Sequence, residues 1–316
     1  MKATVVVPTH GGAVRLPRLL NSLAAQTHAD WDAIIVIDGD GDGSEAVVAR
    51  YAHLPVRTIV FPENRGRVAA LNAGLSAARG DVLIRADDDF ELSPTHVAAH
   101  LAPHRREECG VVGLPRNIAP PSRYMRVYGL PADRRGRDEA HSLSPGARWR
   151  LWGGNVSIRR STFERIGGYD HRYRGYGWED FDFGYRLAQA GVPIVLADDA
   201  EVLHYLASTS TEARVRRALA SGAARSTFDS IHGMGASGPA APVPSTRWNQ
   251  MVGGLSDRLS PRTAGTIARG IDALLPVIPE SFGRRAIGLL VEASGAAGYR
   301  LAPATASDRA AEGRAL

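Results

Sequence analysis

The stretch DVLIRADDD, residues 81–89, joins an apolar run to three consecutive aspartates. Residues 81–85 read as a buried strand that ends where the acidic cluster begins. Adjacent carboxylates repel one another, and a divalent cation that prefers oxygen ligands, Mn²⁺ or Mg²⁺, would offset that repulsion. Alternate residues of an extended segment point to the same side, so Asp87 and Asp89 can face one ligand while Asp88 turns away. A solvated acidic turn is the alternative interpretation.

Upstream of this stretch, strand-like and helix-like segments alternate. The rhythm predicts right-handed βαβ units and therefore an α/β fold with a mainly parallel sheet flanked by helices. Ligands of such sheets bind at the carboxyl ends of the strands, where Thr9 and His10 and the acidic run 38–44 also lie. The predicted strands are 4–7, 33–37 and 56–61, and the predicted helices are 16–25, 45–52 and 68–78.

The acidic run 38–44, DGDGDGS, admits three interpretations. As a calcium loop it has Ala49 where a bidentate glutamate belongs, and a strand precedes it instead of a helix. As a dinucleotide fingerprint it carries three acids that would repel a pyrophosphate. A turn that binds a nucleotide base through a carboxylate fits the residues better.

Composition excludes several classes of protein. In the 316 residues, 44% are hydrophobic and 22% charged, which is ordinary for a globular protein. No apolar run approaches the roughly 18 residues of a membrane span, and the N-terminus has no signal-peptide pattern. Cys109 is the only cysteine, which leaves no intrachain disulfide and no cysteine-built zinc site. We therefore expect a cytoplasmic protein, with contact at a membrane surface left open.

The net charge of +5 comes almost wholly from arginine, because Lys2 is the only lysine. A P-loop or a pyridoxal phosphate Schiff base needs an internal lysine, so both are excluded. Arginine suits sites that bind phosphate, and the basic balance alone does not indicate a nucleic-acid partner. We expect none.

The later part of the chain divides into three segments. Residues 120–149 are rich in Pro, Gly and Arg without periodicity, which predicts a long mobile loop. Residues 150–210 return to ordered structure, with strand-like pieces at 193–196 and 202–203. Residues 211–316 read as a helical extension with a linker at 233–245, helices at 262–275 and 282–300, and a disordered tail.

The pair Glu179 and Asp180 directly precedes a predicted helix over 181–190 and follows a loop rich in glycine and aromatic residues. Acids at a helix N-terminus can simply complement the helix dipole. A carboxylate beside Trp178, whose flat face can stack on a sugar, would equally suit a general base. His204 follows a short strand, and as a single histidine it is either a core residue or a metal ligand.

The order and spacing of these segments resemble the inverting GT-A glycosyltransferases of family 2 over residues 3–206. The C-terminal half resembles the catalytic region of galactosyltransferases, a family 7-like feature. The segments that carry the resemblance are Val5–His10, Asp38–Ser44, Asn64–Gly66, Asn72–Gly74, Asp87–Asp89, Gly153–Ser157, Gly167–Asp170 and Gly177–Asp182.

The resemblance implies a GT-A domain over 1–210, with a nucleotide-sugar half over about 1–115 and an acceptor half over 150–210. It implies that a sugar is transferred from a nucleotide sugar, expected to be a UDP-sugar, to an acceptor hydroxyl. It also implies that Asp180 is the general base, with Glu179 as the second candidate. The implied metal ligands are Asp87, Asp89 and His204. The implied donor residues are Pro8, Thr9, His10, Asp38, Asp40, Asn64, Arg65, Arg67, Asn72, Asp87 and Asp88; the implied acceptor residues are Trp152, Gly153, Gly154, Asn155 and Trp178.

Two departures from the family pattern and two rival functions stay open. Gly39 separates Asp38 from Asp40, where the family has adjacent aspartates, so either acid can read the base. Leu71 stands where the family often has arginine. A retaining GT-A transferase and a non-catalytic nucleotide-sugar-binding protein are the alternative functions. The acceptor is not identified, and the C-terminal helices leave homodimerisation or membrane contact open.

Overall fold

The computed structural model describes residues 1–174, 177–205, 208–239 and 243–302. The chain forms two compact units. The N-terminal unit comprises Met1–Ile118, Arg135–Arg174 and Glu179–Leu206, and the C-terminal unit comprises Ala119–Arg134, Gly175–Trp178 and Ala207–Leu316. The prediction placed the domain boundary at residue 210, and two short segments before that residue belong to the C-terminal unit.

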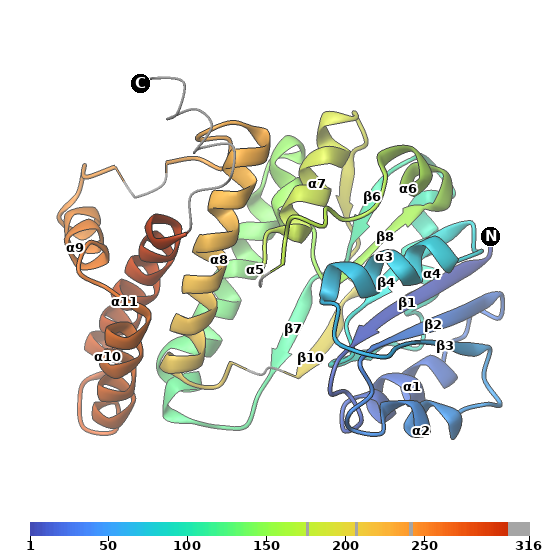
Figure 1. Cartoon of the computed structure of the whole chain (residues 1–316), viewed down its shortest axis with the longest axis horizontal. Coiled ribbons are helices and arrows are strands. Elements are labelled where there is room, and N and C mark those ends of the chain that lie inside the picture. Colours follow the sequence, from blue (N-terminus) through green and yellow to red (C-terminus); the bar gives the residue numbers. More distant parts are fainter. Residues whose placement is uncertain (175–176, 206–207, 240–242, 303–316) are drawn as a thin grey trace. The chain divides into compact units, whose positions relative to one another are not determined.

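A seven-stranded sheet forms the centre of the N-terminal unit (Figure 1). Its strand order is β3-β2-β1-β4-β8-β6-β9, and β1, β2, β3 and β4 run parallel, as predicted. Strand β8 pairs antiparallel with β4 and with β6, so the sheet is mixed beyond β4. The strands are β1 Ala3–Thr9, β2 Trp31–Asp38, β3 Val56–Phe61, β4 Val82–Ala86, β6 Gly110–Val112, β8 Asn155–Arg159 and β9 Ile194–Leu196.

Helices cover both faces of the parallel strands (Figure 1). Val5 and Val7 belong to the core that includes helix α1 (Leu16–Ala24). The intervening Val6 points to the opposite face, where a Cβ on Gly74 of α3 (Arg67–Ala77) would lie 2.4 Å from it. The burial of strands on both faces explains why they are continuous apolar runs. The remaining helices of this unit are α2 Ser44–Ala49, α4 His96–His104, η2 Pro145–Leu151, α6 Arg160–Ile166, α7 Glu179–Gln189 and η3 Asp198–Ala200.

A second, three-stranded sheet lies beyond the aspartate cluster. Strand β10 (Val202–Tyr205) pairs antiparallel with β5 (Phe90–Leu92) and parallel with β7 (Pro115–Ile118). In this register His204 lies opposite Phe90, the residue that follows the three aspartates. The small sheet thus brings a residue from late in the chain next to the acidic cluster.

The prediction of a long mobile loop over residues 120–149 is wrong, because most of that segment is helical. The π-helix η1 (Met125–Gly129) runs into α5 (Leu130–Ser142), and η2 follows. Ala140 is the only residue of α5 that is buried, so this helix lacks the apolar periodicity by which a helix is recognised in a sequence. Its arginines, alanines and glutamate favour a helix, and Pro131 sits in the first turn, where proline is tolerated.

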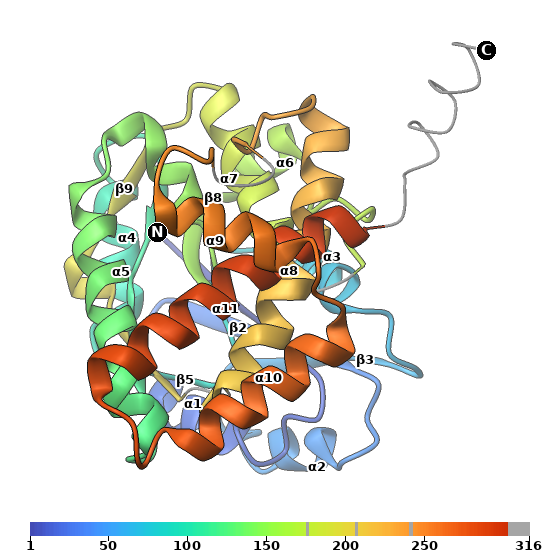
Figure 2. The same cartoon turned by 90° about the vertical axis from the view of Figure 1, so that its left-hand side faces the viewer.

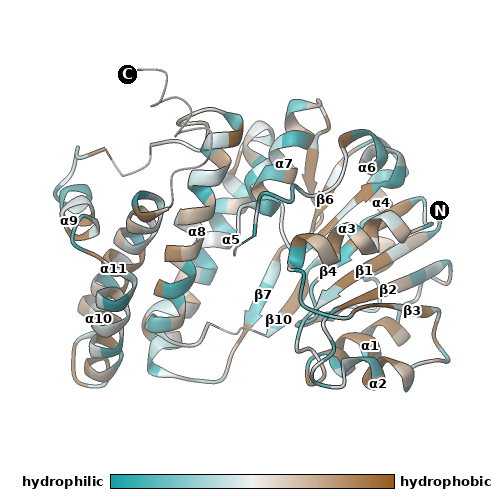
Figure 3. Ribbon diagram, viewed as in Figure 1, coloured by the Kyte–Doolittle hydropathy of each residue, from teal (hydrophilic) through white to brown (hydrophobic). Residues whose placement is uncertain are grey.

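Four helices account for most of the C-terminal unit: α8 Thr211–His232, α9 Arg247–Ser256, α10 Pro261–Leu274 and α11 Glu280–Leu301. Helices α8, α10 and α11 pack together (Figure 2). A Cβ on Gly222 would come 2.0 Å from the carbonyl oxygen of Gly295, so glycine permits the close approach of α8 and α11. In Figure 3 hydrophobic and hydrophilic residues alternate along α8, as in a helix packed on one face.

The helices predicted at 262–275 and 282–300 are therefore confirmed within two residues, and α9 was not predicted. Residues 233–239 and 243–245 lie between α8 and α9 and contain no helix or strand, as expected for a linker. The tail predicted to be disordered, from residue 303 onward, lies outside the described residues. Among the helices of the described residues, none combines the length and apolar character that crossing a membrane requires.

Candidate functional site

A pocket of about 190 Å³ opens at the carboxyl ends of β1, β2 and β4. Parallel strands end at one edge of the sheet, so the polar residues that follow them meet there. Seven of the predicted donor residues line the pocket, together with Arg15, Gly66 and Ala70. The seven are Pro8, Thr9, His10, Asp38, Asn64, Arg67 and Asp88.

One wall of the pocket is organised by Asp38 at the end of β2. Its two carboxylate oxygens accept hydrogen bonds from the backbone N–H groups of Arg65 (2.6 Å) and Gly66 (2.8 Å). His10 Nδ1 lies 2.7 Å from the backbone carbonyl oxygen of Asp38. Asp38 is only 3% exposed, whereas Asp40 is exposed and lies outside the lining of the pocket. The two acids thus differ in burial and in position relative to the pocket.

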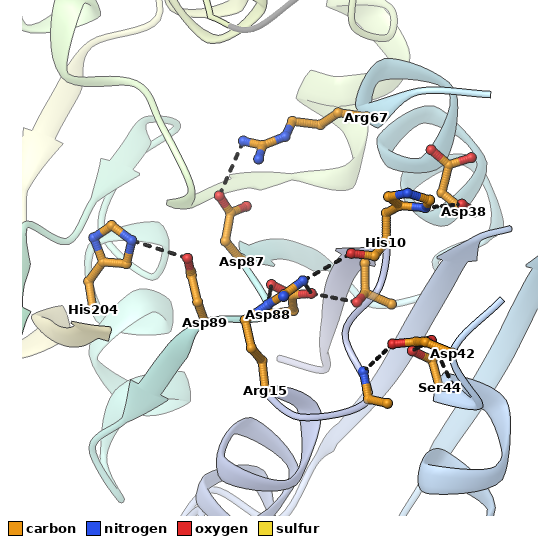
Figure 4. A network of polar contacts seen from close by, with 12 residues as sticks. His10, Arg15, Asp38, Asp42, Ser44, Arg67, Asp87, Asp88, Asp89 and His204 are labelled. Atoms are coloured by element: carbon orange, nitrogen blue, oxygen red, sulfur yellow. Dashed lines mark hydrogen bonds and ion pairs between the residues drawn. The ribbon is translucent and has the colours of Figure 1, made fainter. Parts of the chain in front are cut away.

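The three aspartates after β4 point in three directions (Figure 4). Asp87 points toward Arg67, Asp88 toward Arg15 and Thr9, and Asp89 toward His204. The prediction was that Asp87 and Asp89 face one ligand while Asp88 turns away. Asp87 and Asp89, however, do not converge, and within the described residues no cluster of three or more His, Cys, Asp or Glu side chains is placed to hold a metal ion.

Asp88 is a structural acid. Its Oδ2 accepts a hydrogen bond of 2.5 Å from Thr9 Oγ1, and Arg15 donates to both of its oxygens, at 2.9 Å from Nε and 2.8 Å from Nη2. A bidentate arginine–carboxylate pair fixes geometry as well as charge. Asp88 and Arg15 therefore tie the loop after β1 to the loop after β4, and both line the pocket.

Asp87 lies between two arginines. Arg85 Nε donates to its Oδ1 at 3.0 Å, and Arg67 Nη1 lies 3.4 Å from its Oδ2. Burial raises the pKa of Asp87, but the two guanidinium groups outweigh burial, and the net pKa is lowered. Gly154 makes room for this carboxylate, because a Cβ there would lie 2.6 Å from Asp87 Oδ2. Asp87 is thus held as an anion.

Asp89 and His204 fit a metal site. His204 Nε2 lies 3.2 Å from Asp89 Oδ2, and its Nδ1 lies 2.7 Å from Asn117 Oδ1. If Nδ1 donates to Asn117, Nε2 faces the carboxylate with a lone pair, an arrangement that requires a proton or a cation between the two. Asp89 Oδ1 is buried and has no hydrogen-bond partner among the described residues. Carboxylate oxygen and imidazole nitrogen together suit Mn²⁺.

The two acids at the start of α7 differ in exposure and partner. The side chain of Asp180 is 18% exposed, and its Oδ1 forms a short ion pair with Arg85 Nη1. Glu179 is 2% exposed, and its Oε2 has no hydrogen-bond partner within the described part of the chain. Burial, aided by the charge of Asp180, raises the pKa of Glu179 to about 7. Asp180 is the acid that solvent reaches.

Three of the predicted acceptor residues have structural roles. Asn155 is buried: its Nδ2 donates to the carbonyls of Gly113 and Ala200, and its Oδ1 lies 2.9 Å from His100 Nε2. Trp152 is 3% exposed and stacks on Phe183, so it offers no open face to a sugar. Gly154 packs against Asp87, as described above, and Gly153 is half-buried.

Two further predicted site residues are not among the residues that line the pocket. Asn72 clamps Tyr169, since its Oδ1 accepts from the Tyr169 N–H at 2.7 Å and its Nδ2 donates to the Tyr169 carbonyl at 2.8 Å. Trp178 belongs to the C-terminal unit, where its Nε1 donates to Ser221 Oγ at 3.2 Å. Its φ of 68° is the only positive value among the described non-glycine residues, a strained backbone that often marks functional sites.

Arg85 and Arg15 are the site residues that the sequence did not reveal. Arg85 is 2% exposed and contacts both Asp87 and Asp180. Its signal was an arginine within an otherwise apolar strand, a position where a charge is costly unless it is paired. Arg15 carried no comparable signal, because an arginine just before a helix is ordinary.

Two sequence models of known protein families match parts of the chain. The sequence model of glycosyl transferase family 2 matches residues 4–167, which is more than half of the chain. The chain belongs to this family. A second model, described as the N-terminal domain of galactosyltransferase, matches residues 140–207. Both parts of the predicted resemblance are therefore confirmed.

Two relatives named for the group that they transfer are each 30% identical to this family 2 member. Validoxylamine A glucosyltransferase of Streptomyces hygroscopicus subsp. jinggangensis is 30% identical over 227 residues, 62% of this chain and 54% of the relative. N-acetylglucosaminyl-diphospho-decaprenol L-rhamnosyltransferase of Mycobacterium tuberculosis is 30% identical over 238 residues, 65% of this chain and 76% of the relative. The chain spans about half the length of the validoxylamine A enzymes.

Solved structures confirm the GT-A fold. A mannosyltransferase from Pyrobaculum calidifontis, in complex with GDP-Man and Mn²⁺, superposes with a TM-score of 0.64 at 18% identity, covering 95% of this chain and 88% of the other. TarS 1–349 of S. aureus superposes with a TM-score of 0.51 at 15% identity, covering 93% and 91%. At these identities the likeness concerns the fold alone.

Proposed function

We propose that this family 2 member is an inverting, metal-dependent glycosyltransferase that moves a sugar from a nucleotide-sugar donor to an acceptor hydroxyl. The observation that carries the proposal is the pocket at the carboxyl ends of β1, β2 and β4, bordered by Asp88 and Arg67. The pocket is polar and has arginine for the diphosphate, which suits a nucleotide sugar. Relatives that transfer glucosyl and rhamnosyl groups support the same class of reaction.

The donor would lie against Asp38 and the backbone of 64–66. Asp38, held by two backbone N–H groups, still has lone pairs with which to accept a hydrogen bond from a base. We therefore assign the base-reading role to Asp38 and not to the exposed Asp40. Uracil and guanine both present an N–H donor, so UDP- and GDP-sugars are the donors to test first.

Asp89 and His204 would hold the divalent ion, with Mn²⁺ favoured over Mg²⁺ by the imidazole ligand. When bound, such an ion supplies positive charge for the diphosphate of the leaving nucleotide. Arg67 adds a second positive charge beside Asp87. The proposed metal dependence thus rests on two side chains and the donor phosphates, a smaller protein ligand set than the three residues predicted.

Asp180 would remove the proton from the acceptor hydroxyl as the oxygen attacks the anomeric carbon. A base must reach a proton on a bound acceptor, and Asp180 is accessible whereas Glu179 is buried. Attack from the face opposite the leaving group inverts the anomeric configuration. The oxygen–carbon bond forms as the bond from that carbon to the nucleotide diphosphate breaks, and the proton passes to Asp180.

The proposal is tested by donor turnover and product configuration. Nucleotide sugars are screened by thermal shift with Mn²⁺, since a bound ligand stabilises the folded state by mass action. The stabilising donor is then incubated with glycoside, polyprenyl diphosphate-sugar and cyclitol acceptors, and the product anomer is read by NMR. Retention of configuration would indicate the retaining alternative. Donor binding without transfer or donor hydrolysis would indicate a binding protein.

A contact between the C-terminal helices and a membrane is also proposed, on the exposed side chains around the turn from α10 to α11. Val277 is 78% exposed, Phe282 64% and Leu274 54%, and Arg284 and Arg285 follow them. Apolar side chains next to arginines suit the interface of an anionic bilayer. Sedimentation with phosphatidylglycerol vesicles tests this: the Val277→Asp variant should remain in solution, whereas Val14→Asp, at another exposed valine, should sediment like the wild type.

A further inference from the structure

Arg85 joins two acids that lie far apart in the sequence. It is the fourth residue of β4, and its guanidinium contacts Asp87 through Nε at 3.0 Å and Asp180 through Nη1. The same Nη1 lies 3.3 Å from the hydroxyl of Tyr169. Asp180 follows Arg85 by 95 residues, so this single side chain connects the strand that ends at the aspartate cluster with the first turn of α7.

The cost of burying Arg85 is high for a purely structural contact. The side chain is only 2% exposed, and its Nη2 is buried without a hydrogen-bond partner among the described residues. Buried ion pairs are often no more stable than apolar side chains of similar volume. The neighbouring residues of β4, Ile84 and Ala86, belong to the apolar core on the other face of the strand. Folding alone does not explain a charge at this position.

The surroundings hold Arg85 rigidly. The Tyr169 hydroxyl also accepts a hydrogen bond from Trp152 Nε1 at 3.2 Å, and its ring stacks on Phe183 of α7 with the centroids 4.6 Å apart. Asn72 fixes the backbone of the same tyrosine through two hydrogen bonds. The guanidinium therefore has little conformational freedom, and it holds the two carboxylates that it binds in fixed positions.

We infer that Arg85 is a positioning residue for the transfer reaction, one that fixes the carboxylate of Asp180 relative to Asp87, which in turn contacts Arg67 of the pocket lining. The inference rests on the proposed function, because it takes Asp180 to be the base. Arg85 does not contact the acceptor proton; it acts through Asp180. A displaced base reduces turnover steeply, since errors of about 1 Å in a reacting group can cost 10²-fold.

The test is a double-mutant cycle in the full-length chain. Arg85→Lys keeps the charge but cannot reach both carboxylates with a planar fork, and kcat should fall by roughly 10- to 100-fold. Donor affinity, measured by calorimetry without acceptor, should change by less than about threefold, because Arg67 still holds Asp87. In the Asp180→Asn background the same substitution should have little further effect on kcat, because the group that it positions is already inactive.

Arg137→Lys is the matched control. Arg137 lies on α5 and its Nη2 pairs with Glu201, so its substitution removes a part-buried arginine–carboxylate pair that includes no residue of the pocket lining. It should lower the melting temperature and leave kcat at the wild-type level. If Arg85→Lys behaves like this control, Arg85 is only structural and the inference fails.

The outcomes separate the inference from the proposed function. If Asp180→Asn keeps wild-type turnover, the assignment of the base is wrong. If Asp180→Asn greatly lowers kcat and Arg85→Lys lowers the remaining kcat by the same factor as in the wild type, Asp180 is still the base, and the positioning role of Arg85 is overturned. Should Arg85→Lys not fold, Tyr169→Phe replaces it, since it removes only the hydroxyl beside Nη1. It should lower kcat by about threefold, and only when Asp180 is present; an unchanged kcat would overturn the inference.

Discussion

Two polar clusters of the N-terminal unit differ in the charge of their side chains. Around Arg85 the side chains are charged: two arginines lie against Asp87, and Asp180 completes the cluster. Along α4, His96, His100 and His104 form a ladder in which no side chain is exposed. Arg67 of the first cluster lines the pocket, whereas the histidines of the second contact side chains of β8.

The histidine ladder is built for the neutral form. His100 lies 2.9 Å from both Ser157 Oγ and Asn155 Oδ1, and His104 Nε2 lies 2.9 Å from the same serine. Burial lowers the pKa of His100 and of His104 to about 4, and that of His96 falls well below its usual value. The charged cluster can take part in a reaction at neutral pH, whereas the ladder only supports the fold. Substitutions should therefore affect turnover only in the charged cluster, whereas in the ladder they should affect stability alone.

The largest expected effect is on turnover, at Asp180. Asp180→Asn keeps the size of the side chain but cannot accept a proton, so kcat should fall by about 10²- to 10⁴-fold. Donor affinity should stay nearly constant, because the base acts on the acceptor. Steady-state kinetics together with calorimetry of donor binding measure the two effects separately.

Glu179→Gln is the control for that substitution. If Asp180→Asn retains more than about a tenth of wild-type turnover while Glu179→Gln is inactive, the base is Glu179. If both variants are active, neither acid is the base. In that case the comparison between a reactive and a structural cluster loses its basis.

The next effect is on donor binding, at Asp89. Asp89→Asn should weaken Mn²⁺-dependent binding of the nucleotide sugar by about 10- to 100-fold and leave the melting temperature of the unliganded protein nearly unchanged. Asp88→Asn provides the contrast in stability, because Asp88 holds Thr9 and Arg15 and its loss should lower the melting temperature of the unliganded protein. Full donor affinity in EDTA would remove the metal from the proposal.

Much of the fold could be predicted from the sequence because burial leaves a pattern. Strand β3 was predicted at its observed bounds, and β1, β2 and β4 within two residues at either end. All are apolar runs bounded by polar residues. Helix α5 escaped because only Ala140 of it is buried, and α9 because glycines interrupt its apolar residues. A helix without an apolar face leaves no period to detect.

Seven of the donor residues predicted from the sequence line the pocket, but the contacts that these and the other site residues make were not predicted. The acids were recognised because clustered carboxylates are unusual after a buried strand. Which partner each acid takes depends on side chains distant in sequence, such as Arg85 for Asp180 and Asn117 for His204. The buried roles of Asn155 and Trp152 depend likewise on His100 and Phe183. No local pattern encodes such pairings.

A third effect concerns acid stability and the histidine ladder. The folded state binds protons at His100 only near pH 4, whereas the unfolded chain binds them near 6.5, so stability should fall as the pH drops through this window. Between pH 7 and pH 5 this histidine should account for about 2 kcal/mol of lost unfolding free energy. Urea unfolding at both pH values measures the loss.

In His100→Gln the difference between the two pH values should shrink by that amount. The exposed His53→Gln should leave the difference as in the wild type. An unchanged pH dependence in His100→Gln would mean that the ladder is not the acid-sensitive element. The two clusters would then differ in charge only and not in their response to pH.

The smallest effect has the opposite sign and arises at Glu179 in the charged cluster. Its pKa is raised to about 7 from 4.5, mainly by burial, so the folded state binds the proton more tightly than the unfolded chain. The stability that this carboxyl contributes is complete below pH 4.5 and is lost as the pH rises through 7. Between pH 6 and pH 8 the wild type should therefore lose about 1–2 kcal/mol of unfolding free energy, and Glu179→Gln, which removes the titration, should not show this loss. Asp180→Asn should instead destabilise at pH 8, because it deprives the buried Arg85 of a charged partner. Urea unfolding of both variants at the two pH values distinguishes these outcomes, and a Glu179→Gln variant that is less stable at pH 8 would mean that the ionised carboxylate is needed to balance the arginines.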